Sequence, residues 1–228
     1  DYIISRLQMY LQVYFHPVSR SMEVILDHLL MRAKHIYEHP NEFEPSFTPY
    51  MLMPFFNKRF TLDDYLALDD GVLTTYFNHW THSSDDILND LANRFMNRRP
   101  FKSAIYDQQT ADLLPTLRNL IQTAGFDERY YTAVNDSFKL PYDTYNPKAS
   151  KAQSEIELVQ PNGEFIELSQ VSTLVASVSG REAGDQRFFF PKEMLQNQQS
   201  IEIFEPIYEK FQSCLLYTSD AADDLIGV

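Results

Sequence analysis

The sequence predicts a mainly α-helical protein with a small C-terminal α+β part, and three observations support this prediction. In residues 1–125, apolar side chains recur at helical spacing, as at Met22, Ile25 and Leu29. Short runs with the two-residue period of strands begin only after residue 126. The 228-residue chain is 44% hydrophobic, so it can bury a sizeable core, and its 6 glycines leave no glycine-rich phosphate loop.

The helices of the first part are delimited by proline, glycine and capping residues. Residues 1–38 are expected to form two helices with a break near Pro17, because proline lacks the amide hydrogen that a helix interior needs. Residues 39–60 contain several prolines among aromatic residues, so an irregular but packed segment is expected there. Further helices are expected at residues 61–68, interrupted by Gly71, then at 72–80, from a cap at 83–86 to Arg98, and at 110–124, ended by Gly125.

The second part contains the strand signals. Segments 155–159 and 164–168 alternate polar and apolar residues and flank Pro161-Asn162-Gly163, which predicts an antiparallel hairpin with a tight turn. Segments 130–134, 171–178 and 187–190 are expected to form further strands. The chain is expected to return to helix at residues 191–195 and 204–211.

Three regions are expected along the chain: a helical portion at residues 1–125, a small α+β subdomain at 126–213, and a tail at 214–228. The tail begins at Cys214, where the amphipathic pattern stops. Its first residues, Cys-Leu-Leu-Tyr-Thr-Ser-Asp-Ala-Ala-Asp, resemble the translation of a sequencing adapter, so the tail is expected to be non-native. A natural disordered tail is the alternative. Residues 1–6 already have the pattern of a helix interior, so natural sequence is expected to precede them.

The composition argues against several classes of protein. The formal net charge is −13, which disfavours a general surface for duplex DNA but is compatible with a local basic pocket for a phosphorylated small molecule. No apolar run approaches the roughly 20 residues of a membrane helix, so no membrane association is expected. A single cysteine excludes an internal disulfide and fits the reducing cytoplasm, which is the expected location.

Residues with catalytic chemistry are few and scattered. The 6 histidines include no His-Asp dipeptide and no HExxH motif. His79 and His82 could share a helix face, but a metal needs three or four converging ligands, so a structural or surface role is favoured for them. The paired carboxylates at 63–64, 69–70 and 85–86 lie where helices begin or end, so capping is favoured over acid–base catalysis.

Two polar clusters allow both a structural and a functional interpretation. Residues 8–21 place Tyr, His, Gln, Ser and Arg side chains close together around Pro17. They could form a polar seam inside a helical bundle, or a pocket wall for a polyanion. Residues 97–102 hold three cations in an acidic chain, and these could stabilise a helix C-terminus or contact a phosphate.

These two clusters carry a resemblance to the HD-superfamily phosphohydrolases. It rests on Arg98–Lys102 and on the stretch Met9-Tyr10-x-Gln12-Val13-Tyr14-Phe15-His16-Pro17-x-Ser19-Arg20-Ser21, which Glu23-x-Ile25-Leu26 follows. The chain resembles the bacterial deoxynucleoside triphosphate triphosphohydrolases, relatives of the eukaryotic SAM- and HD-domain deoxynucleotide triphosphohydrolase. The likeness covers residues 1 to about 211 and implies an HD-type helical bundle for the first region.

The resemblance implies a metal-dependent hydrolysis of deoxynucleoside triphosphates (dNTPs) to deoxynucleoside and triphosphate. In that family a divalent metal, such as Mg²⁺ or Mn²⁺, is held by a His…His-Asp…Asp set and activates the attacking water. Those ligands are expected upstream of Asp1, so this chain is expected to hold no metal and to be inactive by itself. Gln12, Tyr14, His16 and Arg20 match the positions that contact the substrate.

The resemblance also implies regulation and assembly. Arg98 and Lys102 match contacts to an activating nucleotide at a subunit interface, and a homotetramer is implied for the complete protein. Two alternatives stay open, because a fold does not determine a function. One is a non-catalytic nucleotide-sensing and oligomerisation module on the same fold. The other is an HD phosphohydrolase that acts on a monophosphate or a cyclic dinucleotide.

Overall fold

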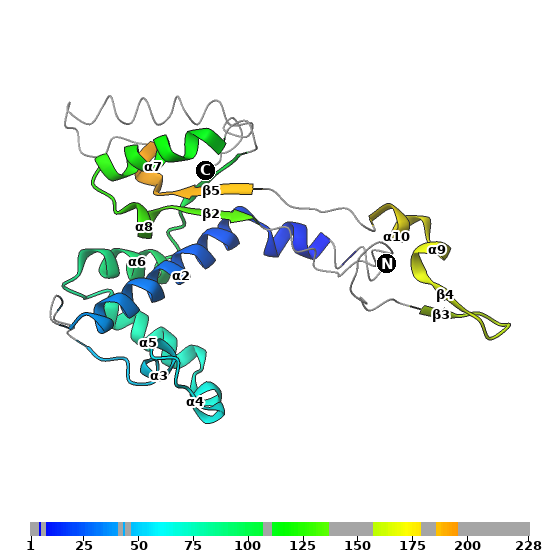
Figure 1. Ribbon diagram of the computed structural model, residues 1–228, viewed down its shortest axis with the longest axis horizontal. Helices are drawn as coiled ribbons and strands as arrows, with labels where there is room; N and C mark the ends of the chain where they lie inside the picture. Colours follow the sequence, from blue (N-terminus) through cyan, green and yellow to red (C-terminus); the bar gives the residue numbers. More distant parts are fainter. Residues whose placement is uncertain are drawn as a thin grey trace.

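The computed structural model describes residues 5, 8–40, 43, 47–106, 111–136, 157–178 and 186–195. Within these residues the chain is mainly helical with a small antiparallel sheet, as the sequence predicts (Figure 1). Segments 141–153, 204–211 and 214–228, for which the sequence makes predictions, lie outside the described residues. No helix in the described ranges combines the length and apolar character needed to cross a membrane.

The helical elements, in chain order, are the π-helix η1 (Tyr10–Tyr14), α2 (Pro17–Glu38), α3 (Met53–Phe56), α4 (Leu62–Ala67), α5 (Asp70–Trp80), α6 (Asp86–Met96), the 3₁₀ turn η2 (Ala111–Leu113), α7 (Leu114–Thr123), α8 (Glu128–Tyr131), α9 (Leu168–Val171), α10 (Thr173–Val178) and the 3₁₀ turn η3 (Lys192–Leu195). The strands are β1 (Lys102–Ile105), β2 (Ala133–Asp136), β3 (Glu157–Val159), β4 (Phe165–Glu167) and β5 (Gln186–Phe190). One sheet has the order β1-β5-β2 with antiparallel neighbours, and β3 and β4 form a separate antiparallel pair.

The predicted break at Pro17 is confirmed, because η1 ends at Tyr14 and Pro17 opens α2. Proline suits the first position of a helix, where its missing amide hydrogen is not needed. His16 is the N-cap residue, and its Nδ1 accepts a hydrogen bond from the Val18 amide at 3.3 Å. The long helix that follows runs through the helical body in Figure 1 and packs mainly against α6.

The capping predictions for the acidic pairs are also confirmed. Asp85 caps α6 and Asp69 caps α5, each by accepting a backbone hydrogen bond from the first helical turn. Thr61 and Asp64 form a reciprocal capping box at α4, and the hydrogen bonds from Thr61 lower the pKa of Asp64. Gly71 lies in the first turn of α5 rather than between two helices; a Cβ there would approach the capping Asp69 Oδ1 to 3.3 Å.

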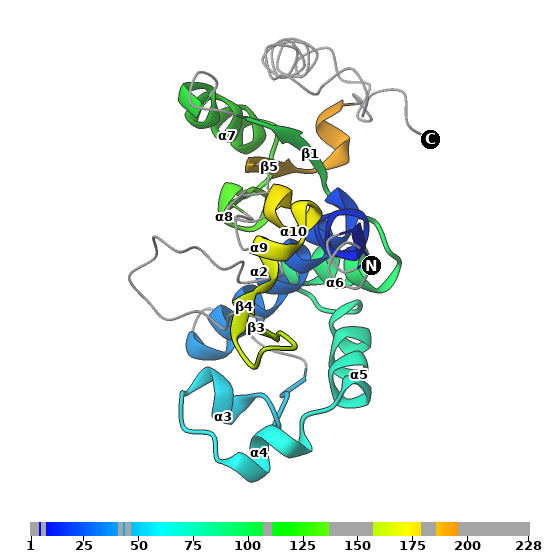
Figure 2. The same cartoon turned by 90° about the vertical axis from the view of Figure 1, so that its right-hand side faces the viewer.

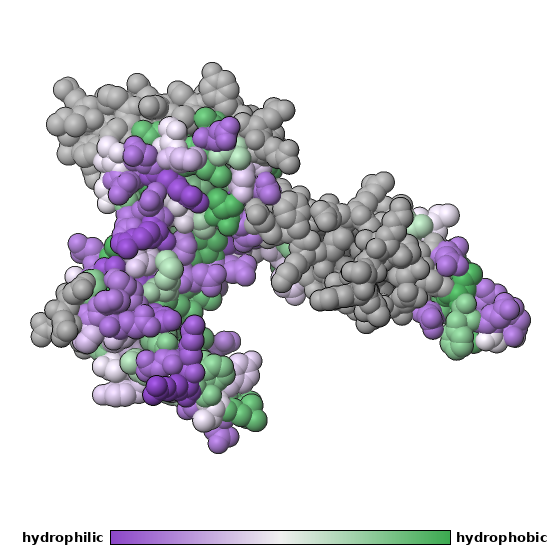
Figure 3. Space-filling model, viewed as in Figure 1, coloured by the Kyte–Doolittle hydropathy of each residue, from purple (hydrophilic) through white to green (hydrophobic). Residues whose placement is uncertain are grey.

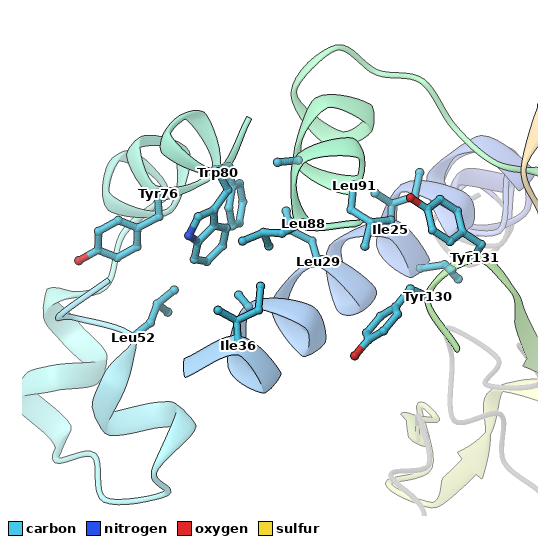
Figure 4. Packing of buried hydrophobic residues seen from close by; sticks show 14 of the residues in the cluster. Ile25, Leu29, Ile36, Leu52, Tyr76, Trp80, Leu88, Leu91, Tyr130 and Tyr131 are labelled. Atoms are coloured by element: carbon cyan, nitrogen blue, oxygen red, sulfur yellow. The ribbon is translucent and has the colours of Figure 1, made fainter. Parts of the chain in front are cut away.

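The main hydrophobic core surrounds α2 (Figure 4). Ile25, Leu29 and Ile36 are buried along α2, and Trp80 of α5 and Leu91 of α6 belong to the same cluster. Each such side chain contributes roughly 1.5–3 kcal/mol when it is fully removed from water. The helical spacing that the sequence shows in α2 therefore marks the face that holds the helices together.

A second, smaller core lies on the other face of the three-stranded sheet. Phe188 and Phe190 of β5 pack there with Leu117 and Ile121 of α7, whereas Phe189 belongs to the main core. This alternation follows from the two-residue period of a strand. The sheet is thus covered by α2 on one face and by α7 on the other, as Figures 1 and 2 show.

The sheet crosses the expected boundary at residue 126. β1 comes before that boundary, yet it pairs with β5, with Ser103 opposite Phe189. The sequence did not predict β1, because its four residues, Lys-Ser-Ala-Ile, show no clear alternation. The strand at β5 and the helical turn at η3 were both expected and both are present.

The α+β part confirms some local predictions and contradicts others. The hairpin of β3 and β4 is present, and Gly163 in its turn has a φ of 85°, which glycine adopts without strain. Tyr130 and Tyr131 were expected to be strand residues but belong to the short helix α8, so β2 begins only at Ala133. Segment 171–178 was expected to be a strand and is helical, with the Ser172 hydroxyl accepting from the Val175 amide at the start of α10.

Candidate functional site

The predicted substrate residue Arg20 lies where the first turn of α2 meets the three-stranded sheet. Its side chain is buried, with 1% of the residue surface exposed. An Nη atom donates a hydrogen bond to the Asn135 carbonyl of β2 at 2.8 Å, and the guanidinium carbon lies 5.9 Å from the centre of the Phe189 ring. The start of α2 therefore presents a cation to the end of the sheet.

A second buried arginine, Arg187, reaches the same end of the sheet. It lies on β5 directly opposite Asn135, and its Nη1 donates to the Ser103 hydroxyl at 3.1 Å. Residues two apart on a strand face the same side, so Arg187 shares the α2-facing side of β5 with Phe189. We call Arg20 and Arg187 the arginine pair; their planar donor groups match phosphate oxygens.

The other predicted substrate residues lie on the exposed side of the same chain segment. Gln12, Tyr14 and His16 are all exposed, and Gln12 donates to the Gln8 side chain at 3.1 Å. Because His16 Nδ1 accepts from a backbone amide, its neutral ring carries the proton on Nε2, where it can donate to a ligand. The structure thus places three predicted residues at the surface and the fourth, Arg20, in the interface with the sheet.

The predicted effector residues follow α6. Arg98 adopts a left-handed conformation with a φ of 52°, which is uncommon for a residue other than glycine. It occupies the position after the helix cap, where its amide bonds the Phe95 carbonyl and the next amide, of Arg99, bonds the Arg94 carbonyl. Arg98 is exposed, and Lys102 is half-buried at the start of β1 opposite Phe190. The helix C-terminus favours this positive charge.

A buried ion network lies beside these cations and was not predicted from the sequence. Arg94 donates to Asp90 at 2.7 Å and to Glu193 at 2.8 Å, and the Tyr131 hydroxyl donates to Asp90 at 2.9 Å. Burial opposes the charge of Arg94, but the Glu193 hydrogen bond and the Asp90 charge outweigh it and raise the Arg94 pKa. Burial and the Asp90 charge both raise the pKa of Tyr131. The sequence signal that could have indicated this network is the four-residue spacing of Asp90 and Arg94, which makes the two side chains neighbours on a helix.

A second polar connection joins α2 to α6. Arg32 donates two hydrogen bonds to Asp85, at 3.0 Å and 2.6 Å, and its guanidinium lies over the rings of Phe43 and Tyr130. Nearby, His28 Nδ1–H donates to the Tyr130 carbonyl at 2.8 Å, and burial lowers the pKa of His28. These contacts hold the helices in place rather than form a catalytic centre.

The described residues do not fit the divalent metal that the resemblance implies. Among them, no group of three or more His, Cys, Asp or Glu side chains could hold a metal ion. His79 stacks on Phe47 with ring centres 4.2 Å apart, and His82 Nδ1 lies 2.9 Å from the Thr81 hydroxyl. The structural role expected for His79 and His82 therefore fits the geometry, and we assign no chemical step to a metal ion held by these residues.

The helical body with its small antiparallel sheet has the same fold as part of a solved phosphohydrolase. A crystal structure of a phosphohydrolase from Bacteroides thetaiotaomicron VPI-5482 matches 84% of this chain and 48% of that chain, with a TM-score of 0.60 and 20% sequence identity. At that identity the likeness establishes the fold alone. No family model matches the sequence.

A closer likeness in sequence is to the uncharacterized protein YwfO of Bacillus subtilis (strain 168). The two are 39% identical over 196 residues, which are 86% of this chain and 45% of YwfO. The chain therefore spans about half the length of the curated relative and of the solved structure that it matches.

Proposed function

We propose that this chain forms part of a metal-dependent phosphohydrolase of the HD type that converts dNTPs to deoxynucleosides and triphosphate. The arginine pair is the observation that carries the proposal, because it places two buried guanidinium groups on one side of the sheet. The phosphohydrolase fold and the residue pattern of η1 and α2 support it. The catalytic metal and its ligands are assigned to sequence outside the described residues.

The electrostatics of the site favour a phosphate chain over other ligands. The chain carries a formal net charge of −13, so a cluster of buried cations is local and not part of a general basic surface. The first turn of α2, a helix of 22 residues, adds the positive end of a helix dipole beside Arg20. Together these groups can stabilise the negative charge on the phosphates while hydrolysis proceeds.

In the proposal, some of the predicted residues contact the phosphates and others contact the nucleoside. In the proposal Arg20 binds phosphate oxygens, and His16 donates to the same ligand from Nε2. Gln12 and Tyr14, which are exposed on η1, contact the sugar or the base. Arg98 and Lys102 bind an activating nucleotide, and the complete protein is a homotetramer. The 228-residue chain is expected to bind a dNTP weakly and to be inactive by itself.

The test is an assay of triphosphate release from the four dNTPs with Mg²⁺ or Mn²⁺, on the complete parent protein and on this chain. Only the complete parent protein is expected to release triphosphate. In that protein, Arg20→Lys keeps the positive charge but loses the forked donors, so it should raise the KM for the dNTP about tenfold or more. Lys192→Gln, at an exposed cation of η3 that is not part of the arginine pair, is the matched control. No release by the parent, with or without an activating nucleotide, would refute the proposal; binding without release would favour the nucleotide-sensing module.

A further inference from the structure

The hairpin of β3 and β4 and the helices α9 and α10 form an arm at residues 157–178. Within the part of the chain that the structure describes, its main contacts are among its own elements, and Figure 1 shows it projecting away from the helical body. A two-stranded hairpin is only marginally stable in water unless another surface covers it. Large apolar side chains of the arm are nevertheless more than half exposed: Val159, Phe165, Val171 and Leu174. The arm therefore has the character of an interaction element.

The charge of the arm has one sign. Residues 157–178 contain the glutamates Glu157, Glu164 and Glu167 and no Lys, Arg or His. The apolar residues and the carboxylates occur in the same short segment. A surface that covers the arm should therefore be apolar with a cationic edge.

The same chain carries a surface of that kind around α3 and α4. An open groove of about 570 Å³ is lined by Tyr50, Met53, Pro54, Asn57 and Arg59. Around it, large apolar side chains are more than half exposed: Tyr50, Phe60, Leu62, Tyr65 and Leu66. No residue of α4 is buried, so nothing described covers this helix on its outer side. Figure 3 shows hydrophobic surface both at this end of the molecule and on the arm.

The charge of the groove complements that of the arm. Residues 47–60 contain the cations Lys58 and Arg59 and no Asp or Glu. Both cations are exposed, and Lys58 adopts a left-handed conformation with a φ of 56° after α3. The carboxylates nearest to Lys58 and Arg59 in sequence are Asp63 and Asp64 of α4, and Asp64 is engaged by Thr61 in the capping box.

The arm and the groove belong to opposite ends of α2. The arm connects to β5, which lies beside Arg20 at the start of α2. The groove lies beyond the other end, where Tyr37 stacks on Phe56. The 17 residues from Arg20 to Tyr37 span about 26 Å at 1.5 Å per residue, so about that length of α2 separates the groove from the end of the sheet that the arm joins.

We propose that the arm of one copy of this chain binds the groove at α3 and α4 of a second copy. The exposed apolar side chains of the arm pack against Tyr50 and Met53, and Glu157 and Glu164 face Lys58 and Arg59. Two such contacts related by a two-fold axis close a dimer in which each arm and each groove is covered. This proposal does not depend on the catalytic activity proposed above.

A charge-reversal cycle on the 228-residue chain tests the contact by sedimentation equilibrium. The variants are Lys58→Glu with Arg59→Glu, Glu157→Lys with Glu164→Lys, and all four changes together. Each reversal alone should weaken the dimer about tenfold or more, and the combination should restore it. Lys192→Glu with Arg129→Glu changes exposed charges elsewhere by the same amount and should leave the dimer intact. The proposal would be overturned if the unmodified 228-residue chain is a monomer, or if neither charge reversal weakens its dimer.

A disulfide test separates a second copy from the chain's own groove. In a Cys214→Ser background, Val159→Cys and Tyr50→Cys are made in separate chains and then mixed. A disulfide between the two different chains is expected under mild oxidation. A disulfide that forms only when both cysteines are in one chain would show that the arm fills its own groove, and the proposal would be wrong. Circular dichroism of each variant checks that the helical content is retained.

Discussion

The connection between Arg32 and Asp85 allows the contribution of one buried ion pair to be separated from that of a helix cap. Asp85 accepts two hydrogen bonds from Arg32 and also caps α6 by accepting from the Leu88 amide at 2.8 Å. Asp85→Asn keeps a good N-cap but removes the charge. The Arg32 side chain is 8% exposed and that of Asp85 16%, so the guanidinium is left largely buried with a neutral partner. We expect a loss of about 2 kcal/mol in the free energy of unfolding, below the 3–5 kcal/mol of a fully broken buried pair.

Asp85→Ala should cost about 1 kcal/mol more than Asp85→Asn, because it also removes the cap. Urea unfolding at pH 7, followed by circular dichroism, measures both differences. Burial alone would raise the pKa of Asp85, but the Arg32 hydrogen bond and the backbone amides outweigh it, so the folded pKa is lowered. The stabilisation by ionised Asp85 is therefore fully present above its unfolded pKa of about 3.9 and is lost as the pH falls through the folded pKa.

The difference between the parent and Asp85→Asn should consequently shrink in the acid range, below about pH 4. Two results would refute this reasoning. One is a free energy of unfolding for Asp85→Asn that lies within about 0.5 kcal/mol of the value for the unmodified protein at pH 7, since ordinary surface substitutions change it by that much. The other is a difference between the two proteins that stays constant from pH 7 into the acid range.

Three further predictions concern the helices. Arg98→Gly should raise the free energy of unfolding by up to about 1 kcal/mol, because Arg98 has a φ of 52° that glycine adopts without strain; thermal unfolding measures this, and a destabilised variant would contradict it. Burial lowers the pKa of His28, so the unfolded chain binds a proton more readily than the folded one, and the protein should lose stability as the pH falls below about 6.5. His28→Gln should show less of this loss in urea titrations at pH 7.5 and 5.5; an equal loss in both proteins would count against the role of His28. Leu29→Ala removes a fully buried side chain and should cost about 2–5 kcal/mol in the same assay, and a cost below 1 kcal/mol would contradict the packing.

Several elements could be predicted because their causes are local. An N-cap side chain bonds an amide two or three residues later, so Asp69 and Asp85 indicate their helices from sequence alone. The same is true of Gly125, which has a φ of 96° after α7, and of Gly163 in the hairpin turn. Pro17 likewise determines the start of α2 through its fixed backbone angle and missing amide hydrogen.

Other elements could not be predicted because their causes are distant in the sequence. β1 is a strand because β5, more than 80 residues later, supplies its hydrogen bonds, and the register pairs Lys102 with Phe190. Segment 171–178 is rich in β-branched residues, which favour strands, but its backbone hydrogen bonds are made within helices. The strand propensity of these residues was therefore outweighed. Local composition does not contain the partner strand of β1, so it cannot predict that strand.

For the candidate site, the sequence by itself determined the polar segment around Pro17, including Arg20, and the cations that follow α6. Only the tertiary structure decided that Arg20 is buried against the sheet while Gln12 and Tyr14 are exposed. It also brought Arg187 to the same end of the sheet, through the pairing of β2 with β5. The physical reason is the range of the interactions: caps and helical periods act within a few residues, whereas strand register and burial depend on segments that the chain brings together only when it folds.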